Sequence, residues 1–396
     1  MKDLRSFIED WRNHSPEETV VIKDEVDPKY EITAIVKKFD LAGLYPLLIF
    51  ENVKGHRIPV VCNVEATNKQ LAFALGVEPD RLDAWYNERE EELLAGKVKF
   101  PPVEVPPSAA PVKEVVIPAD RVDLYAYPFL IHHLGEVPYL TRGIGITRDP
   151  VNGLLHAAYY RLMVKGKNLM VTHITPGRHL WHIYKKAERM GRNLPIAFAV
   201  GSHPAWSMGA QSRIAHPPTE YDVMGALLGE SLEVVRCETS DLLVPARAEM
   251  VIEGELRPGL LESEGPWSDF TRYSQVAQRH PVFVTAITHR RDMILHDAGS
   301  WLLAGHAFTR IPQQAYVRRE IIKAVPSVRD FRFAFFPQPM YGLISMEKTH
   351  EGEPKQAILA AFANELYLKY VIALDTDIDL GNPRDVFWAL GTRVQP

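Results

Sequence analysis

The two acids of the segment EGPWSD, Glu264 and Asp269, have the residue types and the spacing that proton-transfer chemistry needs. A spacing of five positions puts two residues on opposite faces of a straight strand. The Gly-Pro pair between them predicts a bend, which lets both carboxyls reach one cavity. Two carboxylates in a partly apolar site have separated pKa values, so one can stay protonated and act as a proton donor. A pair of solvated loop acids is the alternative interpretation.

A single arginine interrupts a run of apolar residues. Arg161 lies in AAYYRLMV, a pattern that predicts a buried strand. A buried guanidinium needs an anionic partner. Arg161 therefore either pairs with an acid as part of the structure or positions the carboxylate of a substrate or cofactor, and this motif leaves both interpretations open.

Four histidines lie within 27 residues: His156, His173, His179 and His182. The segment PGRH, residues 176–179, predicts the start of a helix on which His179 and His182 share one face. Because helix N-termini attract anions, an arginine and a histidine there suit a phosphate, bound directly or through a metal. Ordinary surface or core histidines are the alternative.

These residues need a scaffold, and we expect three domains: residues 1–110, 115–305 and 312–396. The first and third alternate helix and strand signals, which favours α/β domains. The second consists mostly of strands separated by Gly and Pro turns, which favours a β-barrel or sandwich core with inserted helices. Six prolines between positions 101 and 118 predict an extended connection between the first two domains.

Local signals predict several helices within these domains. Asp3 is a suitable N-cap for an amphipathic helix that starts at Leu4. Thr67 and Gln70 form a capping-box pattern. In the third domain we expect helices over 313–324 and 355–369.

Composition excludes several function classes. The net charge is −5, so nothing favours binding to nucleic acid or to an anionic membrane surface. Hydrophobic residues make up 46% and charged residues 24%, as in globular proteins, and no apolar run is long enough to span a membrane. Only two cysteines are present, and the N-terminus is too polar for a signal peptide, so we expect a reducing, cytoplasmic location. The common P-loop, GxGxxG, HExxH and GxSxG signatures do not occur.

Ordered sequence blocks resemble the UbiD family of decarboxylases. The blocks include ITRDP (146–150), YYR (159–161), LPIAFAVGSHPA (194–205), EYDVMGALLGES (220–231), EGPWSD (264–269) and TDIDLGNPRDVFWALGTR (376–393). They follow the order of the family over residues 115–393, whereas residues 1–110 match more loosely.

The resemblance implies a flavin-reductase-like split β-barrel flanked by N-terminal and C-terminal α/β domains. It implies prenylated FMN as cofactor, with Mn²⁺ or another divalent metal, and often K⁺, at its phosphate. The reaction would be a non-oxidative, usually reversible decarboxylation of an aromatic, heteroaromatic or α,β-unsaturated acid. The partners would be this small-molecule acid, a flavin prenyltransferase that supplies the cofactor, and further copies of the chain in a homodimer or higher homo-oligomer.

The resemblance also implies roles for individual residues. The catalytic Glu–Arg–acid triad of the family falls on Glu264, Arg161 and Asp269. Two metal ligands fall on His179 and Glu220. Cofactor contacts fall on Tyr159, Tyr160, Arg161, Thr172, His173, Ile174 and Arg178, with Lys355 as a further phosphate contact.

One position departs from the family pattern. The metal-binding asparagine of the family is His156 in this chain. Imidazole nitrogen suits Mn²⁺ or Zn²⁺ better than K⁺ or Mg²⁺, so the identity of the metal becomes an open question.

Two other functions compete with decarboxylation. The exchange at His156 also suits a non-catalytic flavin- and metal-binding subunit of a larger carboxylase complex. A metallohydrolase that uses His156, His173 and His179 is the third hypothesis. For the substrate pocket, we expect a contribution from WLLAGHAFTR, residues 301–310, in which His306 or Arg310 meets a second polar group.

Overall fold

The structure is a computed structural model that describes residues 2–214, 217–268, 274–299, 307–334 and 339–393. Asp269 and His306, both singled out from the sequence, lie outside the described residues. The chain divides into two compact units, Met1–Gly305 and His306–Pro396. Among the described residues, no helix is both long and apolar enough to cross a membrane.

Local capping starts the first helices at the predicted positions. Helix α1 (Leu4–His14) begins after Asp3, which accepts a hydrogen bond from the Ser6 backbone N–H at 2.9 Å. The capping box at Thr67 opens α3 (Asn68–Leu75), and Gly76, with φ of 70°, ends it. A residue with a side chain would be strained at that φ, so the glycine terminates this helix for a backbone reason.

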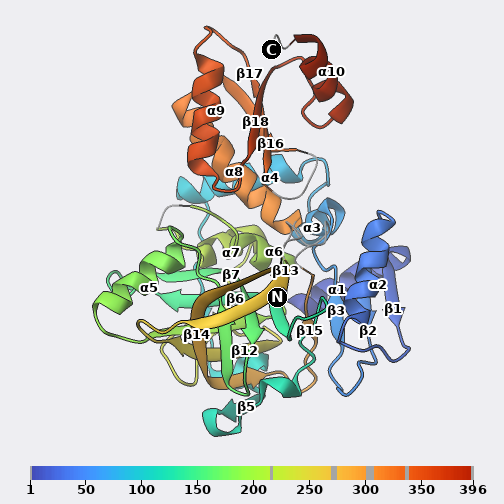
Figure 1. The fold of residues 1–396 in the computed structure, drawn as a ribbon, viewed down its shortest axis with the longest axis vertical. Helices are drawn as coiled ribbons and strands as arrows, with labels where there is room; N and C mark the ends of the chain where they lie inside the picture. Colours follow the sequence, from blue (N-terminus) through green and yellow to red (C-terminus); the bar gives the residue numbers. More distant parts are fainter. Residues whose placement is uncertain (1, 215–216, 269–273, 300–306, 335–338, 394–396) are drawn as a thin grey trace. The chain divides into compact units, whose positions relative to one another are not determined.

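The first unit opens with a small sheet that recruits a strand from far along the chain. Its order is β1 (Thr19–Ile22), β2 (Leu47–Phe50), β3 (Val60–Cys62) and β15 (Leu295–His296). The remaining elements before the proline-rich connection are η1 (Pro16–Glu18), α2 (Glu31–Leu41) and α4 (Leu82–Leu94). Since β15 follows the last barrel strand, this sheet is completed by the central part of the chain (Figure 1).

Six strands close into a ring at the centre of the unit. Neighbours pair in the order β12 (Met250–Leu256), β9 (Leu194–Val200), β6 (Tyr139–Arg148), β7 (Leu155–Val164), β8 (Leu169–Thr172) and β14 (Ser274–His289). Strand β14 also pairs with β12, which closes the barrel. Its extra length lets β14 carry two more partners, β5 (Val115–Pro118) and β13 (Glu262–Ser268).

The other elements of this unit surround or connect the barrel strands. Helix α5 (His179–Arg189) begins at the predicted PGRH segment and packs Leu180, Ile183 and Tyr184 into the core. The proline-rich connection contains only short elements, as its composition predicts. The remaining elements are β4 (Val103–Glu104), η2 (Pro107–Ala109), η3 (Pro111–Lys113), η4 (Ala119–Arg121), η5 (Leu124–Ala126), α6 (Pro204–Gly209), α7 (Glu220–Leu228), β10 (Glu233–Arg236) and β11 (Leu243–Pro245).

One apolar core serves both the N-terminal sheet and the barrel. Leu48 and Phe50 of β2 belong to the same buried cluster as Leu140 of β6 and Phe198 of β9. Fully buried side chains of this size contribute most of the free energy of folding. The N-terminal residues are therefore packed against the barrel and not merely tethered to it.

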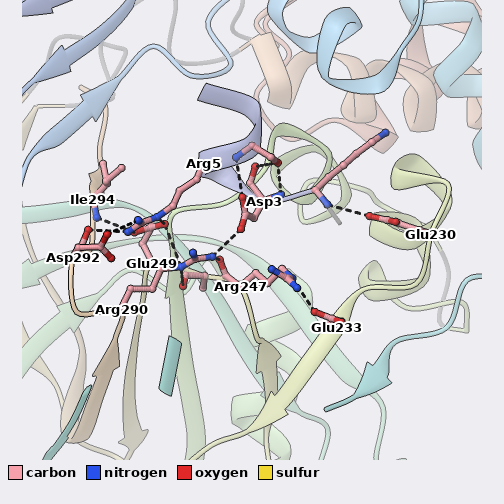
Figure 2. A network of polar contacts seen from close by, with 12 residues as sticks. Asp3, Arg5, Glu230, Glu233, Arg247, Glu249, Arg290, Asp292 and Ile294 are labelled. Atoms are coloured by element: carbon pink, nitrogen blue, oxygen red, sulfur yellow. Dashed lines mark hydrogen bonds and ion pairs between the residues drawn. The ribbon is translucent and has the colours of Figure 1, made fainter. Parts of the chain in front are cut away.

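A polar network fastens α1 to the barrel (Figure 2). Nε and Nη2 of Arg5 donate to the two carboxylate oxygens of Glu249 at 2.8 and 2.9 Å. The Glu249 side chain is 0% exposed, and Nε of Arg290 lies 3.4 Å from its Oε1. Arg290 also donates to Asp3 at 2.9 Å, so the cap of α1 is part of the same network.

The second unit has its own small α/β fold and core. Its elements are α8 (Ala307–Ala324), β16 (Val328–Phe333), β17 (Tyr341–Met346), α9 (Glu353–Asn364), β18 (Tyr370–Asp375) and α10 (Pro383–Arg393). The strands pair in the order β16-β17-β18, and β17 and β18 are parallel.

Both predicted helix boundaries in this unit need correction. The predicted start of α8 at residue 313 is wrong because the helix continues through Pro312, a position in its second turn where it loses a single backbone hydrogen bond. The predicted end of α9 at residue 369 is wrong because Glu365 accepts a hydrogen bond from the Tyr367 backbone N–H at 3.0 Å, and this local turn replaces helical bonding.

Candidate active site

The central pair of the site joins two strands. Nε of Arg161 on β7 donates to Oε1 of Glu264 on β13 at 2.6 Å, and Nη2 donates to Oε2 at 3.0 Å. The Glu264 side chain is 2% exposed, whereas that of Arg161 is 24% exposed. Arg161 thus has an acidic partner, as its position in an apolar strand predicts, and the bidentate geometry holds its guanidinium in one orientation.

The predicted bend after Glu264 is present, but within a strand and not in a loop. Gly265 has φ of 109°, and the register of β13 against β14 shifts between Glu264 and Trp267. The Trp267 ring consequently faces the Arg161 guanidinium, with 5.7 Å between Cζ and the ring centroid. The N–H of Gly265 donates to Sδ of Met163 at 3.2 Å. The bulge therefore aims both Glu264 and Trp267 at Arg161.

A second guanidinium, which sequence reasoning missed, lies beside the pair. Nε of Arg279 on β14 is 3.7 Å from Oε2 of Glu264. The available signal was weak, because a charged residue on a long strand is usually solvated. Two cations next to one buried carboxylate make the site electropositive and suited to an anionic substrate.

His173, which follows β8, is neutral at pH 7. Burial lowers its pKa to about 4, and the charges of Arg161 and Arg279 act in the same direction. Its neighbour Thr172 donates to the backbone carbonyl of Arg161 at 3.1 Å. A neutral imidazole has one donor and one acceptor nitrogen, so His173 can bond to a polar ring edge without adding charge.

His156, His179 and Glu220 converge from β7, α5 and α7, with one potential ligand atom from each within 4.8 Å of the others. Nδ1 of His156 lies 2.9 Å and Nδ1 of His179 lies 3.7 Å from Oε1 of Glu220. Helix α5 begins at His179 and helix α7 at Glu220, so the starts of the two helices place these side chains. Two nitrogens and one carboxylate oxygen are a suitable donor set for a divalent transition metal. His173 is not part of this group among the described residues, which weakens the metallohydrolase hypothesis.

Tyr160 orients the buried member of this group. Its hydroxyl lies 3.1 Å from Nε2 of His156. Burial raises the pKa of Tyr160, and the charge of Glu220 adds to the effect, so the hydroxyl stays protonated. Since Nε2 is next to Tyr160, Nδ1, the atom next to Glu220, is the nitrogen that a metal would bind.

The start of α5 offers an anion site next to these ligands. Arg178 occupies the N-cap position, and its own side chain makes no capping hydrogen bond to the first turn of the helix. The backbone N–H groups of this turn and the Arg178 side chain can both donate to a phosphate.

The remaining predicted residues divide between the two units. Tyr159 lies on β7, and its hydroxyl is hydrogen-bonded to Ser202 and Ser207 at 2.9 and 2.8 Å. Ile174 is buried after β8. Lys355 is exposed on α9 and Arg310 lies on α8, both in the second unit, so their predicted contacts with the phosphate and the substrate stay predictions.

Three family models match almost the whole chain. They are described as the N-terminal, Rift-related and C-terminal domains of 3-octaprenyl-4-hydroxybenzoate carboxy-lyase, and they match residues 14–86, 103–300 and 306–396.

Solved structures agree with this match over the full chain. An evolved dimeric form of the UbiD-class enzyme HmfF from Pelotomaculum thermopropionicum, in complex with prFMN, is 36% identical, with 100% of this chain and 91% of that chain covered and a TM-score of 0.90. The 3,4-dihydroxybenzoic acid decarboxylase of Enterobacter cloacae is 27% identical, with 100% and 86% covered and a TM-score of 0.86. The vanillic acid decarboxylase of Sedimentibacter hydroxybenzoicus is 27% identical, with 100% and 85% covered and a TM-score of 0.89.

Proposed function

This chain belongs to the UbiD family of carboxy-lyases, and we propose that it is a reversible decarboxylase of an aromatic, heteroaromatic or α,β-unsaturated acid that uses prenylated FMN. The observation that carries the proposal is the buried Arg161–Glu264 pair beside Arg279. A site of this kind attracts a carboxylate and keeps a proton-transfer group out of water. Relatives that bind prFMN or act on 3,4-dihydroxybenzoic and vanillic acids support it.

The residues present fit the cofactor. The open first turn of α5 and Arg178 suit its phosphate, together with a cation held by His156, His179 and Glu220. The proposed contacts of its ring system lie in the middle of β7 and at the end of β8: Tyr159, Tyr160, Arg161, Thr172, His173 and Ile174. When bound, prenylated FMN would supply the electron sink that stabilises the carbon after CO₂ leaves.

The protein side chains would then bind, orient and protonate. Arg161, held by Glu264, would orient the substrate carboxylate through its remaining N–H groups. An acid must return a proton to the carbon from which CO₂ departs. We assign that role to Glu264 or Asp269. In the carboxylation direction the same acid would accept the proton.

The metal we propose is Mn²⁺ or another divalent transition ion, with K⁺ as a possible second cation. The set of donor atoms supports this choice, since imidazole nitrogen binds divalent transition ions more tightly than it binds Mg²⁺. The Tyr160 hydroxyl next to His156 supports coordination through Nδ1.

We also propose that the protein works as a homodimer or larger homo-oligomer in the cytoplasm, where a flavin prenyltransferase supplies the cofactor. Large apolar side chains of the second unit support self-association, since Leu366, Phe387 and Trp388 are 66%, 64% and 54% exposed. Cys62 and Cys237 are free and buried, which suits a reducing compartment. Light scattering of the purified holoenzyme measures the oligomeric state.

A direct assay tests the proposed function. The chain is co-expressed with a flavin prenyltransferase, purified without oxygen and given a panel of aromatic, heteroaromatic and α,β-unsaturated acids. We expect CO₂ release from at least one acid and incorporation of deuterium from solvent at the carbon that loses CO₂. Protein that binds the flavin but turns over no acid would instead support a non-catalytic subunit of a larger carboxylase complex.

A further inference from the structure

A buried polar cluster lies where the N-terminal sheet meets the barrel, apart from the residues assigned so far. Glu65, in the segment after β3, has a side chain that is 0% exposed, and its Oε1 lies 3.5 Å from Nη1 of Arg142 on β6. Nε2 of His296 on β15 lies 3.7 Å from Oε2 of the same carboxylate. Because removing a carboxylate from water is costly, a cluster of this kind suggests a purpose beyond packing.

The Arg142 side chain links Glu65 to Tyr159. The guanidinium of Arg142 lies over the Tyr159 ring, with 5.8 Å between Cζ and the ring centroid. Burial raises the pKa of the Glu65 carboxyl, while Arg142 and the Ser207 hydroxyl beside it act in the opposite direction. Ser207 in turn belongs to a closed triangle of hydroxyls with Tyr159 and Ser202, whose two serine oxygens lie 2.9 Å apart. The Tyr159 ring is therefore contacted by the cation that pairs with Glu65, while its hydroxyl is fixed by the two serines.

Tyr159 matters to the site because of its place on β7. Tyr159 and Arg161 are two positions apart on one strand, so their side chains leave the same face. A displacement of the Tyr159 side chain would therefore alter the surface next to the Arg161–Glu264 pair.

We propose that Glu65 is a positioning residue of the flavin site, which acts by holding Arg142 over the Tyr159 ring. This inference rests on the proposed function, because Tyr159 is one of the proposed flavin contacts. Its consequence is that the N-terminal residues, which contribute no group to the Arg161–Glu264 pair or to the metal ligands, still determine the geometry of the site in the barrel.

A double-mutant cycle on the full chain tests the proposal, with FMN as the probe. The variants are Glu65→Gln, Tyr159→Leu, which removes the ring under Arg142, and the double substitution. The readouts are the Kd for FMN and the visible circular dichroism of bound FMN. We expect each single change to weaken FMN binding about three- to tenfold, as the loss of one or two oriented contacts does. The double variant should bind no more weakly than the worse single variant, because Glu65 acts through Tyr159.

Glu249 offers a matched control. Its carboxylate is also 0% exposed and also pairs with an arginine across the junction between N-terminal residues and barrel (Figure 2). Glu249→Gln should lower the melting temperature but leave the Kd and the dichroism of FMN unchanged. If Glu65→Gln does not fold, Arg142→Lys replaces it in the cycle, because that change keeps the charge beside Glu65 while it removes the guanidinium plane from the Tyr159 ring.

The outcomes separate this inference from the function on which it rests. Additive effects of Glu65→Gln and Tyr159→Leu would overturn the inference. So would a Glu65→Gln protein that melts earlier but binds FMN as the wild type does. Wild-type protein that binds no FMN would overturn the proposed function itself.

Discussion

Arg161 donates only some of its N–H groups to Glu264. Nε and Nη2 each donate to one carboxylate oxygen, at 2.6 and 3.0 Å. Nη1 donates to no group in the part of the chain that the structure describes, and the side chain is 24% exposed. The buried acid therefore sets the orientation of a guanidinium that has a donor left for a carboxylate ligand.

Glu264→Gln should abolish turnover. The amide cannot release or take up a proton, and it offers Arg161 one acceptor atom in place of two. CO₂ release and solvent deuterium exchange by the prenyl-FMN-loaded enzyme measure the effect. Glu262→Gln is the control, because Glu262 lies two positions earlier on the same strand and pairs with Lys165 at the surface. An active Glu264→Gln enzyme would refute the assignment of this residue.

His156→Asn should shift the metal preference of the site. The change replaces a nitrogen donor with a carbonyl oxygen, so the affinity for Zn²⁺ or Co²⁺ should fall about 10- to 100-fold while Mg²⁺ binding changes less. Titration calorimetry on the flavin-free protein measures both affinities, and the absorption bands of bound Co²⁺ report on nitrogen ligation. Tyr160→Phe should weaken binding of Zn²⁺ or Co²⁺ without changing the ligand type. Equal loss of Zn²⁺ and Mg²⁺ affinity in His156→Asn would contradict coordination by the imidazole.

Arg5→Met should destabilise the fold without touching the site. The change leaves the fully buried Glu249 with Arg290 as its remaining cation, and we expect a loss of about 2 kcal/mol in the free energy of unfolding. Urea unfolding measures it. Arg236→Met, which breaks an exposed pair with Glu104, should cost less than about 0.5 kcal/mol. Similar losses of unfolding free energy in both variants would show that the buried Arg5–Glu249 pair stabilises the fold no more than an exposed ion pair does.

His203 should make the protein sensitive to acid. Its Nδ1 accepts a hydrogen bond from the Ala205 backbone N–H at 3.2 Å, and burial lowers its pKa to about 3. Between this value and the unfolded pKa of about 6.5, only the unfolded state binds the proton, so the free energy of unfolding falls as the pH falls.

His203→Asn keeps an N-cap acceptor but removes this titration. The variant should lose about 2 kcal/mol less than the wild type when the pH is lowered from 7 to 5, measured by urea unfolding at both pH values. Parallel pH profiles of the two proteins would show that His203 is not the group responsible.

The sequence by itself determined the helices and strands that depend only on residues close together in the chain. The caps at Asp3 and Thr67 and the start of α5 at His179 depend on hydrogen bonds within one helical turn, so neighbouring residues suffice to predict them. Strand periodicity identified β7 and placed Arg161 on it for the same reason. The match of ordered motifs to a family added the residue roles, including the pairing of Arg161 with Glu264.

Only the tertiary structure decided which distant residues meet. The pairing of β14 with β8 and of β13 with β14 brings Arg279 and Glu264 to Arg161, and the return of β15 to β3 places His296 beside Glu65. These contacts depend on strand register and on a shared core, which are properties of the whole chain. The residues adjacent in sequence therefore do not predict them. For this reason the Arg161–Glu264 pair could be anticipated from motifs, whereas the buried carboxylate of Glu65 and its link to Tyr159 could not.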